Sequence, residues 1–212
     1  MDEKLFAIGD IHGCFEKLKA LMNKLPFDPD HDTIVFLGDY IDRGQDSYKV
    51  ISYLINLKKR CKNVVFLKGN HEYMLENFIA GTDRNTFLAN GGEQTLRSYL
   101  EKNGESRAFP IPPEHLDFFH SLLPYYQTEH FIFVHAGLKD GVKLEDQHPR
   151  DLFWIRDRFI RSEYDFGKTI VFGHTPFSQP YITHNRIGID TGAVYGNKLT
   201  GVELTKMVFY FS

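Results

Sequence analysis

The chain has 212 residues and a formal net charge of −3, with 42% hydrophobic and 25% charged residues. This composition excludes intrinsic disorder and collagen-like repeats, because it is close to that of ordinary globular domains. The mild negative charge also argues against a broad basic surface for nucleic acid or for an anionic membrane. It does not exclude phosphate substrates, since a bound metal ion can supply positive charge locally.

The sequence shows no targeting or membrane-spanning segment. The apolar run before Gly9 is too short for a signal peptide, and no stretch approaches the roughly 18 apolar residues that cross a bilayer. The two cysteines, Cys14 and Cys61, suggest neither a disulfide framework nor a cysteine-based zinc site. We therefore expect a cytoplasmic protein.

The first third of the sequence predicts parallel strands joined by helices. Three short apolar runs, each closed by turn residues, have the composition of buried strands: Leu5–Ile8, Thr33–Leu37 and Val64–Leu67. Between these runs, apolar residues recur with helical spacing at Phe15, Leu18, Leu21, Met22 and Leu25, and at Val50, Ile51, Leu54, Ile55 and Leu57. Strands and helices in alternation indicate βαβ units and a parallel sheet.

The rest of the chain predicts a helical region followed by further strands. The helical pattern runs from about Tyr73 to Leu123 and is interrupted at Asn90–Gly92 and by Pro110, Pro112 and Pro113. Two more buried strands are expected at Phe131–Val134 and Thr169–Phe172, and antiparallel strands at Arg186–Asp190, Leu199–Leu204 and Met207–Phe211. Because no repeat or linker is visible, we expect residues 1–212 to form one domain of the α/β (α+β) class.

Polar side chains follow five of the predicted strands, at the point where each strand ends. They are Asp10 and His12; Asp39, Asp42 and Arg43; Asn70, His71 and Glu72; His135; and His174. Residues at the carboxyl ends of such strands converge on one edge of the sheet, where ligands bind. Carboxylate, imidazole and amide ligands without cysteine suit Mn²⁺, Fe or Zn²⁺. Six ligands suffice for two ions if one carboxylate bridges them, and two ions about 3.5–4 Å apart can drive in-line phosphoryl displacement.

These residues also lie in five ordered motifs: Gly9–Gly13, Gly38–Gly44, Gly69–Glu72, His135–Gly137 and Gly173–Thr175. In these motifs the chain resembles the metal-dependent phosphoprotein phosphatase family, within the calcineurin-like metallophosphoesterases. Asn90–Gly92, Trp154–Arg156 and Ile189–Val194 are similar to the bacterial and phage serine/threonine protein phosphatase branch. The resemblance covers nearly the whole chain. It implies a four-layer αββα fold, with a central β-sandwich of mixed sheets flanked by helices.

The resemblance also implies a role for each motif residue. Asp10 and His12 would bind the first metal, Asp39 would bridge, and Asn70, His135 and His174 would bind the second. The metals would be two divalent ions, Mn²⁺ first, with Fe or Zn²⁺ as alternatives. His71 would protonate the leaving oxygen, oriented by Asp42. Arg43 and Arg156 would hold the phosphoryl oxygens.

The activity that the resemblance implies is that of a metal-dependent phosphomonoesterase, foremost a serine/threonine protein phosphatase. A hydroxide bridging two metals would attack phosphorus in line, and the substrate would be a phosphoprotein or a small phosphomonoester. A symmetrical diadenosine-tetraphosphate hydrolase is the main alternative. Those relatives typically replace the second-motif Asp by Ala and the third-motif Glu by Asp, whereas this chain has Asp42 and Glu72.

The net negative charge of the chain and the two arginines, Arg43 and Arg156, disfavour a phosphodiesterase or nuclease. A non-enzymatic phosphoprotein-binding module is an alternative of another class, expected to lack a bridging or acid residue, and neither is missing.

Several other residues have simpler interpretations. Six histidines outside the motifs are expected to be surface or packing residues: His31, His115, His120, His130, His148 and His184. We expect Cys14 to be a small buried residue at the start of the first helix, and Asn90–Gly92 to break a helix rather than contact the substrate. Tyr195 follows Asp190, Thr191 and Gly192 and could face the phosphate pocket, but we expect it to pack. Glu72 could orient a neighbour or serve the start of a helix. Arg150, Arg158 and Arg161 are alternative cations to Arg156.

Overall fold

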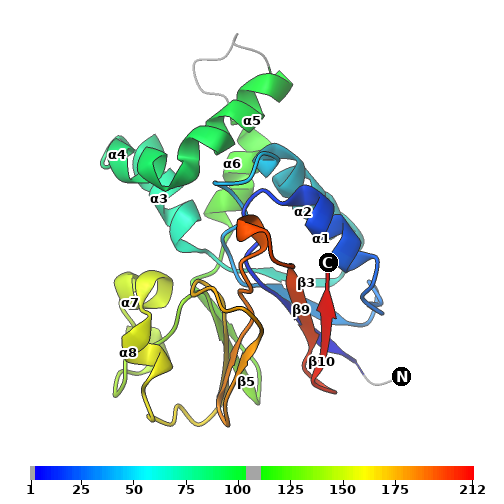
Figure 1. The fold of residues 1–212 in the computed structure, drawn as a ribbon, viewed down its shortest axis with the longest axis vertical. Helices are drawn as coiled ribbons and strands as arrows, with labels where there is room; N and C mark the ends of the chain where they lie inside the picture. The colour runs from blue at the N-terminus through cyan, green and yellow to red at the C-terminus, as the bar shows by residue number, and fades with distance from the viewer. Residues whose placement is uncertain (1–2, 104–110) are drawn as a thin grey trace.

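Two five-stranded sheets pack face to face between layers of helices in the computed structural model, which describes residues 3–103 and 111–212 (Figure 1). The first sheet has the order β10-β9-β1-β2-β3, with β1 (Leu5–Ile8), β2 (Thr33–Phe36), β3 (Asn63–Phe66), β9 (Thr200–Glu203) and β10 (Val208–Phe211). The second has the order β4-β5-β6-β8-β7, with β4 (Tyr125–Gln127), β5 (Phe131–Val134), β6 (Thr169–Phe172), β7 (Tyr181–Ile182) and β8 (Arg186–Gly188). Both sheets are mixed.

Strand pairing confirms most of the predicted directions and corrects one. Strands β1, β2 and β3 are parallel, as the βαβ pattern predicts. Strand β9 pairs antiparallel with β1, and β10 with β9. The antiparallel prediction is wrong for β8 on one of its two sides, because β8 runs parallel to β6 and antiparallel only to β7. Strand β8 is buried along its length, which is the environment that parallel strands prefer.

Eight α-helices lie in the described part of the chain. They are α1 (Phe15–Met22), α2 (Ser47–Arg60), α3 (Asn70–Ile79), α4 (Arg84–Phe87), α5 (Glu93–Asn103), α6 (Pro113–His120), α7 (Pro149–Trp154) and α8 (Asp157–Ile160). The predicted apolar stripes match α1 and α2. Helices α7 and α8 and strands β4 and β7 were not predicted, since they span only two to six residues, too few to show a periodicity. None of the described helices is long and apolar enough to cross a membrane.

The predicted break at Asn90–Gly92 is confirmed. The backbone leaves helical geometry at Asn90 and Gly91, where Gly91 has a φ of 101°. The helical region therefore changes direction between α4 and α5 (Figure 1). Of the three prolines expected in the second loop, Pro112 and Pro113 stand at the start of α6, and Pro110 lies outside the described residues.

Three apolar clusters fill the three interfaces between the four layers. Alternate residues of β1 face opposite ways: Phe6 and Ile8 pack against α1 and α2, whereas Ala7 faces the second sheet. Strand β6 alternates likewise, with Val171 in the cluster between the sheets and Ile170 among the residues of α7 and α8. Strands buried on both faces explain why these runs are continuously apolar. The predicted four-layer αββα fold is confirmed.

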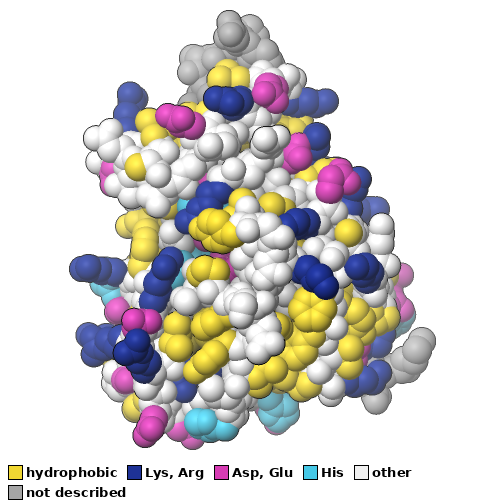
Figure 2. Space-filling view, in the orientation of Figure 1, with side chains coloured by type: hydrophobic (Ala, Val, Ile, Leu, Met, Phe, Trp, Pro, Cys, Tyr) yellow, Lys and Arg dark blue, Asp and Glu magenta, His cyan; other side chains and the backbone are white. Residues whose placement is uncertain are grey.

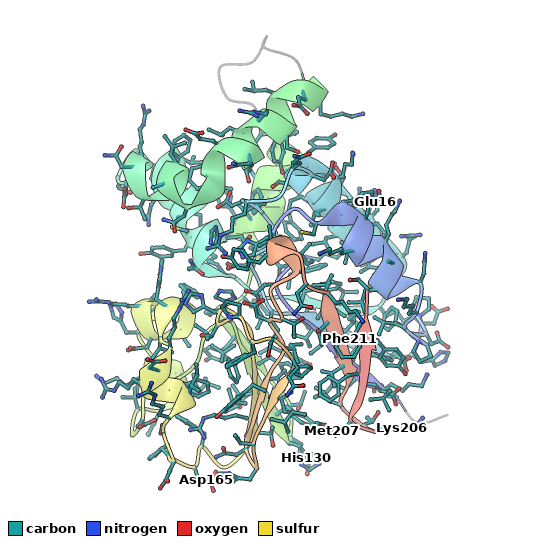
Figure 3. All side chains as sticks on the ribbon, in the orientation of Figure 1. Glu16, His130, Asp165, Lys206, Met207 and Phe211 are labelled. Carbon is teal, nitrogen blue, oxygen red and sulfur yellow. The ribbon has the colours of Figure 1, made fainter. Side chains whose placement is uncertain are left out.

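The two ends of the sandwich differ. Lys206 and Met207 lie in the turn between β9 and β10, at one end (Figure 3). The carboxyl ends of the parallel strands β1, β2 and β3 lie at the other end, next to those of β5 and β6, which are parallel to each other. Hydrogen bonds join the loops of the two sheets there: the backbone N–H of His174 donates to Oδ2 of Asp10 at 3.0 Å, and Nδ1 of His135 donates to the carbonyl of Leu37 at 2.8 Å. Residues that follow strands of both sheets therefore meet at this end.

Candidate active site

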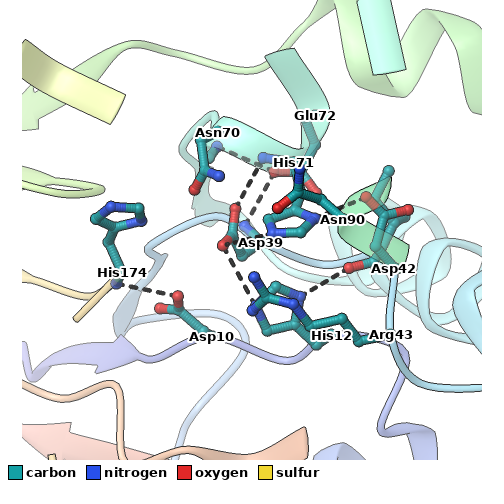
Figure 4. Close-up of polar contacts among 12 residues, drawn as sticks. Asp10, His12, Asp39, Asp42, Arg43, Asn70, His71, Glu72, Asn90 and His174 are labelled. Atoms are coloured by element: carbon teal, nitrogen blue, oxygen red, sulfur yellow. Dashed lines mark hydrogen bonds and ion pairs between the residues drawn. The ribbon is translucent and has the colours of Figure 1, made fainter. Parts of the chain in front are cut away.

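All six predicted metal ligands lie together at this end of the sandwich, and all are buried. Figure 4 shows five of them, Asp10, His12, Asp39, Asn70 and His174. Asp10 and His12 follow β1, Asp39 follows β2, Asn70 begins α3, His135 follows β5, and His174 follows β6. Their exposed fractions range from 0% to 6%. Charged and polar groups buried to this degree need strong partners.

Asp39 occupies the centre of the group. Its Oδ2 lies 3.3 Å from Nε2 of His12, and its Oδ1 lies 3.3 Å from Nε2 of His135. The Oδ1 of Asn70 is 3.0 Å from the same nitrogen of His135. Because the two oxygens of one carboxylate face histidines from different sheets, Asp39 has the placement that a bridging ligand requires.

The histidines present the nitrogen and the charge state that metal binding needs. The Nδ1 of His12 donates to the carbonyl of Ile41 at 2.9 Å, and that of His135 to the carbonyl of Leu37 at 2.8 Å. This leaves the Nε2 lone pairs directed at Asp39. Burial lowers the pKa of His12 to about 3 and also lowers the pKa values of His135 and His174. Neutral imidazole is the form that binds metal.

Asp10 gives a direct test of whether a cation fits. Its Oδ2 accepts from the backbone N–H of His174 at 3.0 Å, but its Oδ1 is buried and has no hydrogen-bond partner. Burial raises the pKa of Asp10 well above its ordinary value. A side chain at Gly173 would collide with Oδ1, so glycine at 173 leaves room for this oxygen. An unpaired buried carboxylate oxygen beside neutral histidines suits a divalent cation.

Glu72 fixes the loop that holds Asp39. Its Oε2 accepts from the backbone N–H groups of Asp39 and Gly69 at 2.9 and 3.0 Å, and its Oε1 accepts from that of Tyr40 at 2.8 Å. Both interpretations of Glu72 are therefore confirmed: the carboxylate accepts a hydrogen bond at the start of α3, and it orients the loop after β2.

The loops at this end adopt unusual backbone conformations. Six non-glycine residues have positive φ in the described part of the chain, and five of them are candidate site residues: His12 (45°), Asp39 (51°), Asp42 (69°), Arg43 (67°) and His174 (62°). Side-chain-bearing residues seldom adopt this region. Such conformations cluster at functional sites, where the surrounding structure enforces them.

His71 and Asp42 form a buried pair beside Asp39. The Nδ1 of His71 lies 2.7 Å from Oδ2 of Asp42, neither side chain is exposed, and the Nε2 of His71 has no hydrogen-bond partner. Burial opposes the charged imidazole, but Asp39 and Asp42 outweigh it and raise the pKa of His71 above its usual value. Thr95 was not predicted, yet its hydroxyl donates to Oδ1 of Asp42 at 2.6 Å. The pair can deliver a proton from Nε2.

The two predicted arginines flank the ligands on opposite sides. An Nη of Arg43 lies 2.8 Å from Nε2 of His12, and Nε of Arg156 donates to Nε2 of His174 at 3.0 Å. Of the alternative cations, Arg150 borders a separate cavity beside Trp154, and Arg161 pairs with Asp157 at 3.6 Å. Lys and Arg side chains border a recess in the middle of this face, where acidic and histidine side chains are visible (Figure 2).

Other residues near Arg43 depart from their simple interpretations. Tyr195 is 64% exposed, so the packing prediction is wrong, and its ring centre lies 5.6 Å from the guanidinium carbon of Arg43. The carbonyl of Gly91 accepts from the backbone N–H of Arg43 at 3.2 Å. The helix break at Asn90–Gly92 therefore also supports the site. No local sequence signal distinguishes Thr95, because its role depends on contacts across the fold. For Tyr195 the position after Asp190, Thr191 and Gly192 was the one signal that pointed to the site.

The other simple predictions are largely confirmed. Cys14 stands at the start of α1, as predicted, but it is half-buried instead of buried. His115 is buried in the packing around α6, and the other five histidines outside the motifs are exposed: His31, His120, His130, His148 and His184.

Comparisons with known proteins agree with this geometry. The profile of the calcineurin-like phosphoesterase family matches residues 4–200. The asymmetrical bis(5'-nucleosyl)-tetraphosphatase PrpE of Bacillus cereus (strain Q1) is 31% identical, covering 94% of this chain and 90% of its own length. A solved putative diadenosine tetraphosphatase has the same fold, with a TM-score of 0.78, 20% identity, and coverage of 100% of this chain and 94% of its own. A protein serine/threonine phosphatase from Saccharomyces cerevisiae gives a TM-score of 0.66 at 20% identity, over 96% of this chain and 73% of its own. The chain belongs to the calcineurin-like phosphoesterase family.

Proposed function

We propose that the chain is a phosphomonoesterase that acts on phosphoserine and phosphothreonine in proteins, with residues 1–212 forming one catalytic domain. The pair of His71 and Asp42 is the observation that favours this function. A serine or threonine alkoxide is a poor leaving group and needs a proton as the bond to phosphorus breaks. A buried histidine with a free Nε2, held at 2.7 Å by a carboxylate, supplies it.

The residues at the end of the sandwich would hold two divalent ions. In our assignment Asp10 and His12 bind one, Asn70, His135 and His174 bind the other, and Asp39 joins both. When bound, the ions supply an activated water and neutralise charge on the phosphoryl group. The ligand set fits Mn²⁺, which we propose as the physiological ion ahead of Fe or Zn²⁺.

The protein's own groups perform the remaining work. The Nε2 of His71 donates its proton to the leaving oxygen, while Asp42 holds Nδ1–H and stabilises the charged ring. Thr95 in turn fixes Asp42. Arg43 and Arg156, on opposite flanks, each offer a planar guanidinium that can hold two phosphoryl oxygens at once.

A second candidate is asymmetrical hydrolysis of dinucleoside tetraphosphates. The name of the Bacillus cereus relative, 31% identical over nearly its whole length, favours it. The name of that relative specifies asymmetrical cleavage, whereas the alternative considered from the sequence was a symmetrical hydrolase. The conjugate acid of a nucleotide leaving group has a lower pKa than that of a serine alkoxide. We therefore expect this reaction to depend less on a proton from His71.

One set of assays distinguishes these activities. The protein is loaded with Mn²⁺ and assayed on a phosphoserine peptide, a dinucleoside tetraphosphate and a nitrophenyl phosphodiester. We expect the highest kcat/KM for the peptide, and we expect His71→Asn to abolish most of it. A higher kcat/KM for the tetraphosphate would favour the second candidate. No turnover of any substrate by metal-loaded protein would favour a binding module.

A further inference from the structure

A polar cavity opens beside Arg43, outside the group of metal ligands. It has a volume of about 310 Å³ and lies between the loop after β2 and helix α5. Its lining consists of Arg43, Gln45, Gln94, Arg97, Ser98 and Glu101. This volume is near the lower limit of small-ligand pockets, roughly 300–1,000 Å³, so it suits one side chain or one phosphate group better than a nucleoside.

The lining favours an anion. Two guanidinium groups and two side-chain amides can donate hydrogen bonds into the cavity, against the single carboxylate of Glu101. The local formal charge is therefore positive, in a chain whose net charge is −3. Guanidinium groups bind carboxylates and phosphates through paired, charge-assisted hydrogen bonds. Glu101 lies one helical turn beyond Arg97, where it would repel an anion and moderate its affinity.

The cavity is coupled to the proposed active site by shared residues. Arg43 lines the cavity and also reaches Nε2 of His12 at 2.8 Å. Helix α5 carries both Arg97 and Thr95, and Thr95 bonds to Asp42 at 2.6 Å. A substrate phosphoryl group held by Arg43 would thus have this cavity directly beside it.

From this arrangement we infer that the cavity is a second anion subsite, which binds an acidic group of the substrate next to the phosphoryl group under attack. The inference rests on the proposed function: in a phosphoprotein the acidic group is an Asp, Glu or second phosphoserine side chain beside the phosphorylated residue. Arg97 is then a specificity-determining residue. The protein would prefer phosphosites in acidic surroundings.

Two matched phosphoserine peptides test the subsite, one with Asp on both sides of the phosphoserine and one with Asn at the same positions. We expect kcat/KM to be about two- to fivefold higher for the Asp peptide at low salt, a typical value for a charge-assisted contact at a partly exposed site. Added salt should reduce the ratio. Arg97→Gln should bring it close to one, and Glu101→Gln should raise it. Lys102→Gln removes a positive charge from the same helix outside the lining and should keep the wild-type ratio.

The outcomes separate the subsite from the proposed function. A wild-type ratio near one, or a ratio that Arg97→Gln leaves unchanged, overturns the subsite even if peptides are good substrates. If the wild-type protein hydrolyses a dinucleoside tetraphosphate but no peptide, the phosphoprotein function fails. The subsite is then judged by kcat/KM for the tetraphosphate relative to nitrophenyl phosphate. A fall in that ratio in Arg97→Gln supports an anion subsite for the polyphosphate chain, and an unchanged ratio overturns it.

Discussion

The two sheets contribute differently to the candidate site. Loops after the parallel strands of the first sheet supply the proposed bridge, Asp39, and the proposed acid pair, His71 and Asp42. Loops after the second sheet supply His135 and His174, with Arg156 from the segment between α7 and α8. In our proposal the first sheet therefore supplies both the residue that joins the two ions and the residues that protonate the leaving group. The second sheet's side supplies two further proposed ligands and one of the two arginines that we propose hold the phosphoryl group, Arg156; the other, Arg43, follows β2.

Backbone strain follows the same division. Four of the five candidate site residues with positive φ lie in loops of the first sheet, and His174 is the fifth. The loop after β2 withstands this because Glu72 accepts three backbone N–H groups around it. Glu72 thereby holds in place the carboxylate that we propose as the bridge.

The largest effect should come from Asp39→Asn, since Asp39 faces ligands from both sheets. We expect turnover to fall by more than the roughly 10- to 100-fold typical of outer-sphere metal partners, and metal content to fall with it. Chelation of the wild-type protein should give a comparable loss that Mn²⁺ restores. Asp32→Asn is a matched control, because Asp32 is equally buried, at 2% exposed, but precedes β2 instead of following it. Normal turnover and metal content in Asp39→Asn would remove the bridging role.

The next effect concerns the leaving group. His71→Asn should lower phosphoserine hydrolysis by about 10²–10⁴-fold, the usual contribution of a general acid. Hydrolysis of nitrophenyl phosphate should fall much less, because nitrophenolate leaves without protonation. Asp42→Asn should show the same bias more weakly, and the double variant should be far from additive, since the two residues act as a unit. Equal losses on both esters would place the acid elsewhere.

A smaller effect is expected from the second sheet's side of the site. Arg156→Ala should lower kcat/KM by about 10- to 100-fold, the cost of a lost hydrogen bond to a charged group, and by similar factors on both esters. Both esters present the same phosphoryl oxygens, so no leaving-group bias should appear. Arg158→Ala, an exposed neighbour on α8, is the control. A larger loss on phosphoserine than on nitrophenyl phosphate, as expected for His71→Asn, would contradict the proposal that Arg156 acts on the phosphoryl group alone.

The smallest effect concerns stability in the helical layer over the first sheet. Burial lowers the pKa of His115 to about 4, against 6.5 for a free histidine. Between about pH 6.5 and 4, His115 is therefore protonated in the unfolded chain but neutral in the folded one. The free energy of unfolding falls as the pH drops through this range. In His115→Gln this part of the decline in melting temperature should disappear. Replacing the exposed His31 by Gln should preserve the wild-type slope, and an unchanged slope in His115→Gln would assign the acid sensitivity to other groups.

Much of the fold could be predicted because each apolar run is short and closed by turn residues, and because strands such as β1, β2 and β6 are buried almost throughout. The meeting of Asp10, Asp39 and Asn70 followed from the parallel strands. Other features could not be predicted. The exposure of Tyr195 beside Arg43 and the bond from Thr95 to Asp42 depend on tertiary contacts. The direction of β8 depends on how the chain returns across the sheet edge, where β7 is only two residues long.

The bond between the carboxylate of Asp10 and the backbone of His174 joins residues 164 positions apart in the sequence. A metal ion bound by the loops after β1 and β6 would connect one sheet to the other, as a covalent cross-link does. Its binding free energy adds to the free energy of folding. We therefore expect the metal-loaded chain to tolerate weaker packing at the interface between the sheets, where Ala7 lies. Substitutions that weaken this interface would then lower the stability of the folded chain less at high concentrations of divalent ions than at low ones.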